Sequence, residues 1–261
     1  MPSSNKAQRR SVVVNGVKLS ILEEGQGDPV IFVHGVVTTS NIFPKYLGAY
    51  SPNFRGIAVD LRGYGDSEKP SGCNINQFSQ DLIALADALD IKRAVWVGVS
   101  MGGMILQRLA LDNPSRVRAL VLVSTMDRPM ILDENPSTIG KPRDYKEVSR
   151  NIIIGSFPPG TKSEIYQPLL DRIPTWNAAV ISEALASMTI LDLRGKLTPI
   201  EAPTLIVVGE KDDNATPAIA RDMHRQIRNS KVAEFKTGHF MMAEDPERFG
   251  VVLGEFLRGL K

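Results

Sequence analysis

The chain has 261 residues, of which 43% are hydrophobic and 23% are charged, and its 31 Lys and Arg nearly balance its 29 Asp and Glu. This composition is typical of a globular protein and too apolar for a disordered one, and the length allows one large domain or two small ones. A net charge of +2 gives no reason to expect nucleic acid or an anionic membrane as a partner. The single cysteine, Cys73, excludes an internal disulfide, and no Cys/His cluster has the spacing of a structural zinc site.

The sequence carries no pattern typical of a membrane segment. No apolar run approaches the roughly 18 residues that a membrane-spanning helix needs. Residues 1–10 are polar and basic, and they lack the apolar region that follows the charged start of a secretory signal. We therefore expect a cytoplasmic protein, either a monomer or a small homo-oligomer, whose partner is a small molecule.

Short apolar runs predict the strands in chain order. Residues 12–14 and 17–22 flank Asn15-Gly16, a dipeptide that favours a tight hairpin turn. The runs that follow lack polar alternation, which is typical of strands covered by helices on both faces. They lie at 30–33, 56–59, 94–97, 119–123 and 204–208, and a further strand is expected at 231–236.

The segments between these runs have helical periodicity. Apolar residues recur on one helical face within 78–89 and again within 249–257. Pro246 suits the first turn of the last helix, with Asp245 before it as the N-cap. Strands that alternate with helices, after an antiparallel hairpin, predict an α/β protein with a mostly parallel sheet.

One segment interrupts this alternation. Between 127 and 199 no clear apolar β-run occurs, prolines are frequent, and the expected short helices carry apolar residues such as Phe157 and Trp176. A segment of this length is not a plain loop, and its apolar residues have to pack against something. We therefore predict a helical cap at 127–199, inserted into one core domain formed by 1–126 and 200–261.

The strongest chemical motif is Gly98-Val-Ser100-Met-Gly102, directly after the strand at 94–97 and directly before a helical stretch. A nucleophile elbow needs this arrangement, because a sharp strand-to-helix turn lifts the serine hydroxyl above the sheet. Small residues two positions before and after the serine allow the backbones to approach closely. The helix also points its positive end at the place where negative charge develops during acyl transfer.

A serine hydroxyl is a poor nucleophile until a histidine takes its proton, and the chain has only three histidines. His224 lies within a helical stretch, where it faces solvent or packs laterally. His34 ends a strand and precedes Gly35, a position that suits loop architecture better than proton transfer. His239 lies in the loop after the last strand, and such loops build the sites of α/β sheets. Elimination therefore indicates His239 as the base.

The histidine in turn needs a carboxylate that holds its tautomer and stabilises the imidazolium. The strand at 204–208 ends in Gly-Glu-Lys-Asp212-Asp213, which places two candidate acids in one loop. The order Ser100, Asp212 or Asp213, His239 is the Ser…Asp…His chain order of α/β-hydrolases.

The loop after the third strand, His34-Gly35-Val36-Val37, supplies the remaining part of such a site. The backbone N–H groups of Val36 and Met101 would together bind the oxyanion. Main-chain donors have no side-chain signature, so this assignment rests on position alone.

Together these motifs resemble the α/β-hydrolase superfamily over nearly the whole chain, from about residue 12 to residue 260. Within it, residues 97–104 and the following Asn113-Pro114 look like the group of 3-oxoadipate enol-lactonases, esterases and cofactor-free haloperoxidases. The resemblance implies an eight-stranded sheet flanked by helices, with a helical cap after the sixth strand, which fits 127–199. The motifs that carry it are His34-Gly35, 60–67, 98–103, 209–212 and Gly238-His239.

The chain departs from the family pattern at the acid. Relatives usually carry Gly-x-x-Asp with a proline four residues after the Asp, whereas here Asp212 has the spacing to Gly209 and Asp213 has the spacing to Pro217. We favour Asp212, because the turn from the glycine sets the approach of the carboxylate, and Asp213 is the alternative. Asp127, after the sixth strand, occupies a position that some relatives use.

The residues expected to line the substrate pocket are apolar. A dianionic lactone would need cationic groups near the nucleophile. Arg128 and Arg143 could supply them, but the sequence does not give the direction in which their side chains point. An apolar, Met-rich pocket instead favours a small apolar ester or lactone, and the chemistry needs neither a cofactor nor a metal. The expected pocket residues are Val37, Met104, Met130, Phe157, Trp176 and Phe240.

Three other functions use the same signature. The triad in this superfamily also hydrolyses C–C bonds of ring-cleavage diketones, and it carries out perhydrolysis that is measured as haloperoxidase activity. Some relatives are small-molecule receptors with little or no turnover. An intact Ser/His/Asp set disfavours a receptor that has lost catalysis, but it does not disfavour one that hydrolyses slowly.

Overall fold

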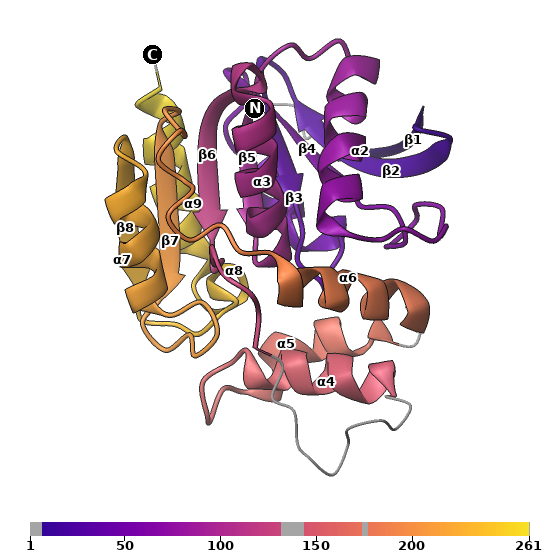
Figure 1. Ribbon diagram of the computed structural model, residues 1–261, viewed down its shortest axis with the longest axis vertical. Coiled ribbons are helices and arrows are strands. Elements are labelled where there is room, and N and C mark those ends of the chain that lie inside the picture. The colour runs from indigo at the N-terminus through magenta and orange to yellow at the C-terminus, as the bar shows by residue number, and fades with distance from the viewer. Residues whose placement is uncertain (1–6, 132–143, 174–176, 261) are drawn as a thin grey trace, which may run out of the picture.

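The computed structural model describes residues 7–131, 144–173 and 177–260. Within these ranges the chain forms one eight-stranded sheet with the order β1-β2-β4-β3-β5-β6-β7-β8, flanked by helices (Figure 1). The predicted α/β architecture, with a mostly parallel sheet, is confirmed. The strands are β1 (Gln8–Val14), β2 (Val17–Gly25), β3 (Asp28–Val33), β4 (Phe54–Asp60), β5 (Ala94–Val99), β6 (Val117–Val123), β7 (Thr204–Gly209) and β8 (Ser230–Phe235).

The sheet begins with the predicted hairpin. Asn15 and Gly16 both have positive φ, 49° and 74°, which is the geometry of the tight turns that this dipeptide favours. β1 and β2 are antiparallel, β2 pairs antiparallel with β4, and β4, β3, β5, β6, β7 and β8 run parallel. The carboxyl ends of these six parallel strands therefore lie at one edge of the sheet.

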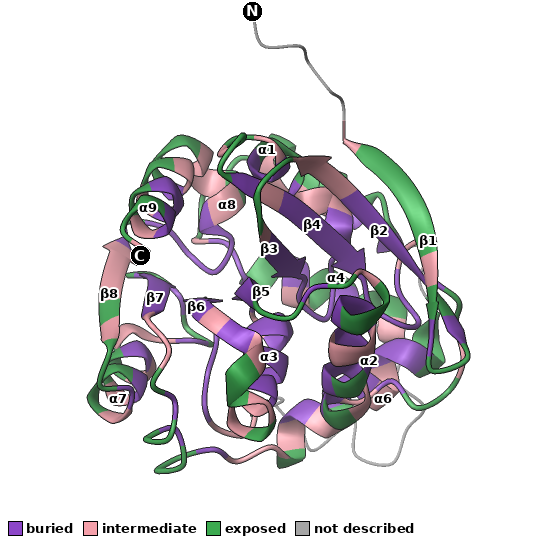
Figure 2. Ribbon diagram, turned by 90° about the horizontal axis from the view of Figure 1, so that it is seen from above, coloured by how far each residue is buried: buried purple, intermediate pink, exposed green. Residues whose placement is uncertain are grey.

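Helices cover both faces of the sheet. α2, α3 and α7 pack on one face, while α1 and α9 pack on the other (Figure 2). The central strands are buried on both sides, which explains their continuous apolar runs: Trp96 of β5 packs toward α2 and α3, and its neighbours Val95 and Val97 pack toward α9. The helices of the core are α1 (Pro44–Leu47), α2 (Ile75–Ala88), α3 (Met101–Asp112), α7 (Pro217–Gln226), α8 (Met241–Glu244) and α9 (Pro246–Arg258).

Between β6 and β7 the chain forms α4 (Tyr145–Gly155), α5 (Ser163–Leu170) and α6 (Ala178–Ile190). These helices lie beyond the carboxyl ends of the strands (Figure 1). The Glu183 carboxylate of α6 accepts hydrogen bonds from the Gly72 and Cys73 N–H groups, 2.8 and 2.7 Å away, and so joins α6 to the loop before α2. The segment predicted as a cap thus contains helices at the edge where the predicted site lies, and Trp176 lies outside the described residues.

Sequence reasoning missed two short helices and one strand extension. α1 and α8 have four residues each, too few for apolar periodicity to develop. The first four residues of β1, Gln8 to Ser11, are exposed on an edge strand and contain no apolar residue. At the last helix the prediction is confirmed, because the Asp245 side chain accepts the Arg248 N–H and Pro246 opens the helix. Among the described residues, no helix has both the length and the apolarity needed to cross a bilayer.

The contact between β3, β5 and α3 requires two glycines. A Cβ on Gly98 would lie 2.6 Å from the carbonyl carbon of Gly102, and a Cβ on Gly102 would overlap the carbonyl oxygen of Val33. Because the obstructing atoms are backbone, no rotamer change relieves the overlap. The start of α3 therefore rests directly on the ends of two central strands.

Gly102→Ala is expected to lower the free energy of unfolding by about 1–3 kcal/mol, because β3 or α3 has to shift to admit the methyl group. Urea denaturation followed by circular dichroism measures this loss. Gly250→Ala is the matched control, since a Cβ there would lie 3.7 Å from Tyr46 in ordinary contact, and alanine favours a helix interior. Equal stability of Gly102→Ala and the unsubstituted protein would contradict the close approach.

Candidate active site

Ser100 lies at the turn between β5 and α3 in a strained backbone conformation. Its φ is 54° and its ψ is −117°, a region that residues with a Cβ rarely adopt. The turn is held by its neighbours: the Ser100 N–H donates to the Val123 carbonyl at 2.9 Å, and the Ser100 carbonyl accepts the Thr125 hydroxyl at 2.7 Å. The serine side chain is thus presented at the carboxyl edge of the sheet, at the N-terminus of α3.

His239 lies in the loop between β8 and α8, at the same edge of the sheet. Its Nδ1 is 2.7 Å from Oδ2 of Asp212, and both side chains are buried. An ionised carboxylate accepts a hydrogen bond from Nδ1–H, so the ring proton stays on Nδ1 and Nε2 carries the free lone pair. The ring makes no other hydrogen bond within the described residues, so Nε2 is available to a substrate-side group.

Asp212 is buried as an ionised acceptor. Burial raises the pKa of its carboxyl, but the charge and hydrogen bond of His239 and the N–H groups of Ala215 and Asn214 outweigh burial and hold the pKa below its ordinary value. Those N–H groups donate to Oδ1 at 2.9 and 3.0 Å, so both carboxylate oxygens have partners. Asp213 is exposed to solvent. The structure therefore brings Asp212, and not Asp213, against His239.

Neither of the other histidines has the environment of a base. His34 is fully buried, its Nδ1 lies 2.8 Å from the Gly35 carbonyl, and its Nε2 accepts the Leu61 N–H at 3.1 Å. Burial lowers the pKa of His34, so the neutral ring bridges two backbone groups. His224 is exposed near the end of α7 and contacts the Ser230 hydroxyl.

Asp127 and Arg128, at the end of β6, belong to a separate charge cluster. The Asp127 side chain is fully buried and accepts hydrogen bonds from Arg128 at 2.9 Å and from Gln226 at 2.8 Å. The second arm of Arg128 pairs with Asp222 at 2.9 Å. The Arg128 guanidinium is therefore engaged by two carboxylates, and Arg143 lies outside the described residues.

The loop after β3 lies against the serine. A Cβ on Gly35 would be 3.2 Å from the Ser100 Cβ, so any larger residue would press against the serine. The Ser40 N–H donates to the buried Asp60 carboxylate at 2.7 Å, which fixes the far end of the loop. Within the described residues, the Val36 and Met101 N–H groups donate to no other protein group.

The predicted apolar pocket residues that the structure describes belong to the large apolar core on the α2 and α3 face of the sheet, which also contains residues of α4, α5 and α6. The Phe157 and Phe240 rings stack at 5.3 Å between centroids, and the Phe240 ring meets the His239 ring edge-on at 5.4 Å. Met130 packs at the margin of the cluster. The members among the predicted residues are Val36, Val37, Met101, Met104, Phe157 and Phe240.

Two groups that hold this site were not predicted from the sequence. The Ser156 carbonyl, at the end of α4, accepts the His239 N–H at 2.9 Å, and the Thr125 hydroxyl anchors the Ser100 carbonyl. A backbone carbonyl has no sequence signature at all. Thr125 is the second residue after β6, which neighbours the strand that presents Ser100, and this position was the one available signal.

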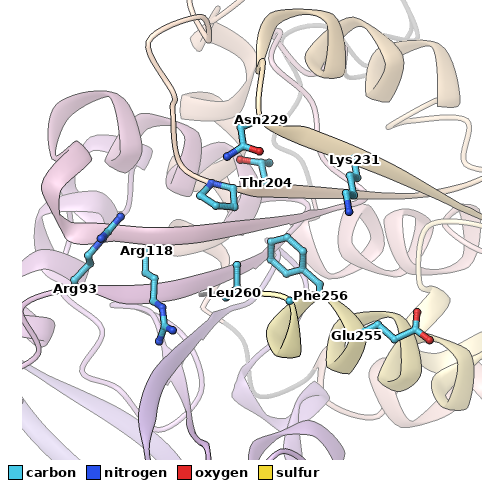
Figure 3. Close-up of a pocket in the computed structure, with 10 residues that line it drawn as sticks. Arg93, Arg118, Thr204, Asn229, Lys231, Glu255, Phe256 and Leu260 are labelled. Carbon is cyan, nitrogen blue, oxygen red and sulfur yellow. The ribbon is translucent and has the colours of Figure 1, made fainter.

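A separate cavity of about 460 Å³ lies at the opposite, amino-terminal edge of the parallel strands (Figure 3). Arg118, Thr204 and Lys231 come from the starts of β6, β7 and β8, and Phe256 comes from α9. The cavity is therefore separate from Ser100, Asp212 and His239, which lie at the carboxyl edge. Among the described residues, no group of His, Cys, Asp and Glu is arranged to hold a metal ion.

Comparison with known proteins agrees with this fold. Residues 28–146 match the family described as alpha/beta hydrolase fold, and residues 137–248 match the family described as serine hydrolase (FSH1). The AB hydrolase superfamily protein YisY of Bacillus subtilis is 28% identical, over 92% of this chain and 95% of that protein. The 3-oxoadipate enol-lactonase 2 of Acinetobacter baylyi is 25% identical, over 92% of each chain.

The fold itself is matched by a solved structure. The enol-lactonase from Burkholderia xenovorans LB400 superposes with a TM-score of 0.87 at 24% identity, over 95% of this chain and 100% of that one. Its likeness confirms the predicted α/β-hydrolase fold. The chain therefore has the α/β-hydrolase fold, and it is similar to proteins of the α/β-hydrolase superfamily over nearly its whole length.

Proposed function

We propose that the protein is a serine hydrolase that cleaves a small carboxylic ester or lactone through an acyl-enzyme intermediate. One observation carries the proposal: a strained serine at the start of α3 shares the carboxyl edge of the sheet with a buried His239–Asp212 pair. A histidine whose tautomer is fixed by a buried carboxylate is the general base that a serine nucleophile needs.

In the proposed reaction, Ser100 Oγ attacks the substrate carbonyl carbon while His239 Nε2 takes the hydroxyl proton. Asp212 holds the ring with its proton on Nδ1 and stabilises the imidazolium. The imidazolium then gives its proton to the leaving alkoxide, so an alcohol departs and the acyl group stays on Ser100. A water molecule, deprotonated by His239, attacks the acyl carbon, and the carboxylic acid leaves as Ser100 recovers its proton.

The oxyanion formed in both steps is assigned to the N–H groups of Val36 and Met101. Both donors lack an acceptor within the described residues, and Met101 is the first residue of α3. The N-terminus of a helix carries partial positive charge, which favours the developing alkoxide. The scheme needs neither a metal nor an organic cofactor.

The charge distribution supports an uncharged acyl group. The cluster beside His239 is apolar, and Arg128 is already paired with Asp127 and Asp222. A buried substrate carboxylate without a cation would be costly. We assign substrate contacts to Val37, Met104, Met130, Phe157, Trp176 and Phe240, and we assign the role of a lid over them to the cap, 127–199.

Ser100→Ala is expected to lower the hydrolysis of p-nitrophenyl butyrate at least about 10³-fold, because no other nucleophile forms the acyl-enzyme. Spectrophotometric turnover and labelling by a fluorophosphonate, read by mass spectrometry, measure the loss. Ser124→Ala is the control, since Ser124 also ends a central strand with positive φ, 45°, but no helix follows it. Labelling that persists in Ser100→Ala would refute the proposed nucleophile.

Asp212→Asn is expected to lower kcat about 10⁴-fold, because an amide neither fixes the Nδ1 proton nor stabilises the imidazolium. Asp213→Asn, one residue away and exposed, is expected to keep the rate of the unsubstituted protein. Steady-state kinetics of the two variants on one ester measure the difference. Equal modest losses would exclude Asp212 as the acid.

A substrate panel separates ester hydrolysis from the other chemistries of this triad. Linear esters, lactones, ring-cleavage diketones and peracid formation from acetate and hydrogen peroxide are to be compared by kcat/KM. Highest efficiency on diketones or peracid formation would replace the ester assignment. A single-turnover burst without steady-state turnover would instead indicate a slow receptor.

A further inference from the structure

The loop that carries His239 is held by two hydrogen bonds from different parts of the chain. The His239 N–H donates to the Ser156 carbonyl of the cap, and the preceding Gly238 N–H donates to Oε1 of Glu244, both at 2.9 Å. A Cβ on Gly238 would lie 2.7 Å from the Ser156 oxygen and 2.8 Å from Pro158, so the loop is enclosed tightly. Glu244, the last residue of α8, thus reaches back to the turn that presents the ring.

Glu244 is also a second negative charge beside the His239–Asp212 pair. Burial raises the pKa of its carboxyl, the charge of Asp212 raises it further, and the Gly238 N–H, Lys211 and His239 lower it, with a net rise. The Glu244 carboxylate accepts the N–H of Gly238, the residue directly before His239, so its charge lies close to the imidazole in the fold. A nearby carboxylate favours a protonated imidazole over a neutral one.

The other charged groups near α8 are engaged elsewhere or exposed. Asp245 caps α9 by accepting the Arg248 N–H, and Glu247 pairs with Lys45. α5 packs against α8, and the acidic residue of its first turn, Glu164, is exposed. Among the described residues, Lys211, Asp212 and His239 are therefore the charged groups that act on Glu244.

We propose that Glu244 is a positioning residue for His239: it fixes the Gly238 turn, and its charge supports the imidazolium formed when Ser100 gives up its proton. The catalytic part of this inference rests on the proposed serine hydrolase function. The two roles are separable, because a glutamine keeps an oxygen that accepts the Gly238 N–H but carries no charge, whereas an alanine removes both.

Glu244→Gln and Glu244→Ala are to be compared with Glu210→Gln, which removes an exposed negative charge from the loop that carries Asp212. The first readout is the pH dependence of kcat/KM on p-nitrophenyl butyrate, together with kcat and KM separately. In Glu244→Gln the acidic limb of the pH profile is expected to move to lower pH by about half a unit, because an imidazolium without the Glu244 charge loses its proton at a lower pH. Glu210→Gln is expected to leave the limb in place.

In Glu244→Ala we expect, in addition, a fall in kcat of about tenfold with little change in KM, because the ring loses its orientation but the pocket does not change. In 1 M salt the shift of the limb in Glu244→Gln is expected to shrink, as a charge effect at a half-buried site should. Thermal melting of each variant shows whether the remaining activity belongs to folded protein.

The second readout does not depend on catalysis. The chain has three histidines, so the His239 ring signal in an NMR titration is assignable with His34 and His224 variants. The His239 midpoint is expected to fall in Glu244→Gln and to stay in Glu210→Gln. If Ser100→Ala keeps its turnover and labelling while the His239 midpoint still falls in Glu244→Gln, the proposed function fails and the charge role of Glu244 stands. An unchanged midpoint and unchanged kcat in both Glu244 variants would overturn the inference.

Discussion

The close backbone approach at Ser100 is the constraint on which the rest of the site depends. β5 has to turn into α3 within one residue, and this places Ser100 at φ 54°. The turn closes only because Gly98 and Gly102 have no side chain where β5, α3 and the Val33 carbonyl meet. Such strain persists only where neighbours over-determine it, and here Val123 and Thr125 hold both backbone groups of the serine. The same packing places the N-terminus of α3 at the carboxyl edge of the sheet, beside Ser100. The strained backbone of Ser100 and the partial positive charge next to it therefore arise from one packing arrangement.

The His239–Asp212 pair depends on a different feature, the parallel pairing of β7 with β8. Parallel neighbours end at the same edge, so residues 27 positions apart in the chain meet across two adjacent loops. Burial of the carboxylate would be costly on its own, and the N–H groups of Asn214 and Ala215 compensate it. Ser156 then ties the histidine loop to α4. Any displacement of this end of α4 therefore acts directly on the orientation of the ring.

Sequence reasoning reached the sheet, and it singled out Ser100 and His239 as candidates, because both the sheet and the candidate site leave periodic or spaced side-chain patterns. Buried strands are continuous apolar runs, and the elbow needs glycines at fixed offsets from the serine. For the candidate acid the sequence favoured Asp212 but left Asp213 open, because each satisfied one family spacing, and packing shows that Asp212 turns inward toward Ala215. Glu244 carried no pattern either, since a lone glutamate near a helix start is usually a solvated residue. The partner of Glu244 is the backbone N–H of Gly238, and a backbone group leaves no signal in the sequence.

The charge cluster at the root of the cap bears on substrate class more than the overall likeness to enol-lactonases does. Identities of 24–25% establish the fold, and this fold hosts many chemistries. Arg128 follows β6, and Asp127 binds its Nε while Asp222 binds its Nη2. Drawing Arg128 away toward a substrate carboxylate would leave the fully buried Asp127 carboxylate, among the described residues, with Gln226 as its remaining hydrogen-bond donor, at considerable cost. A neutral acyl group makes no such demand, and it suits the apolar Phe157 and Phe240 rings beside His239.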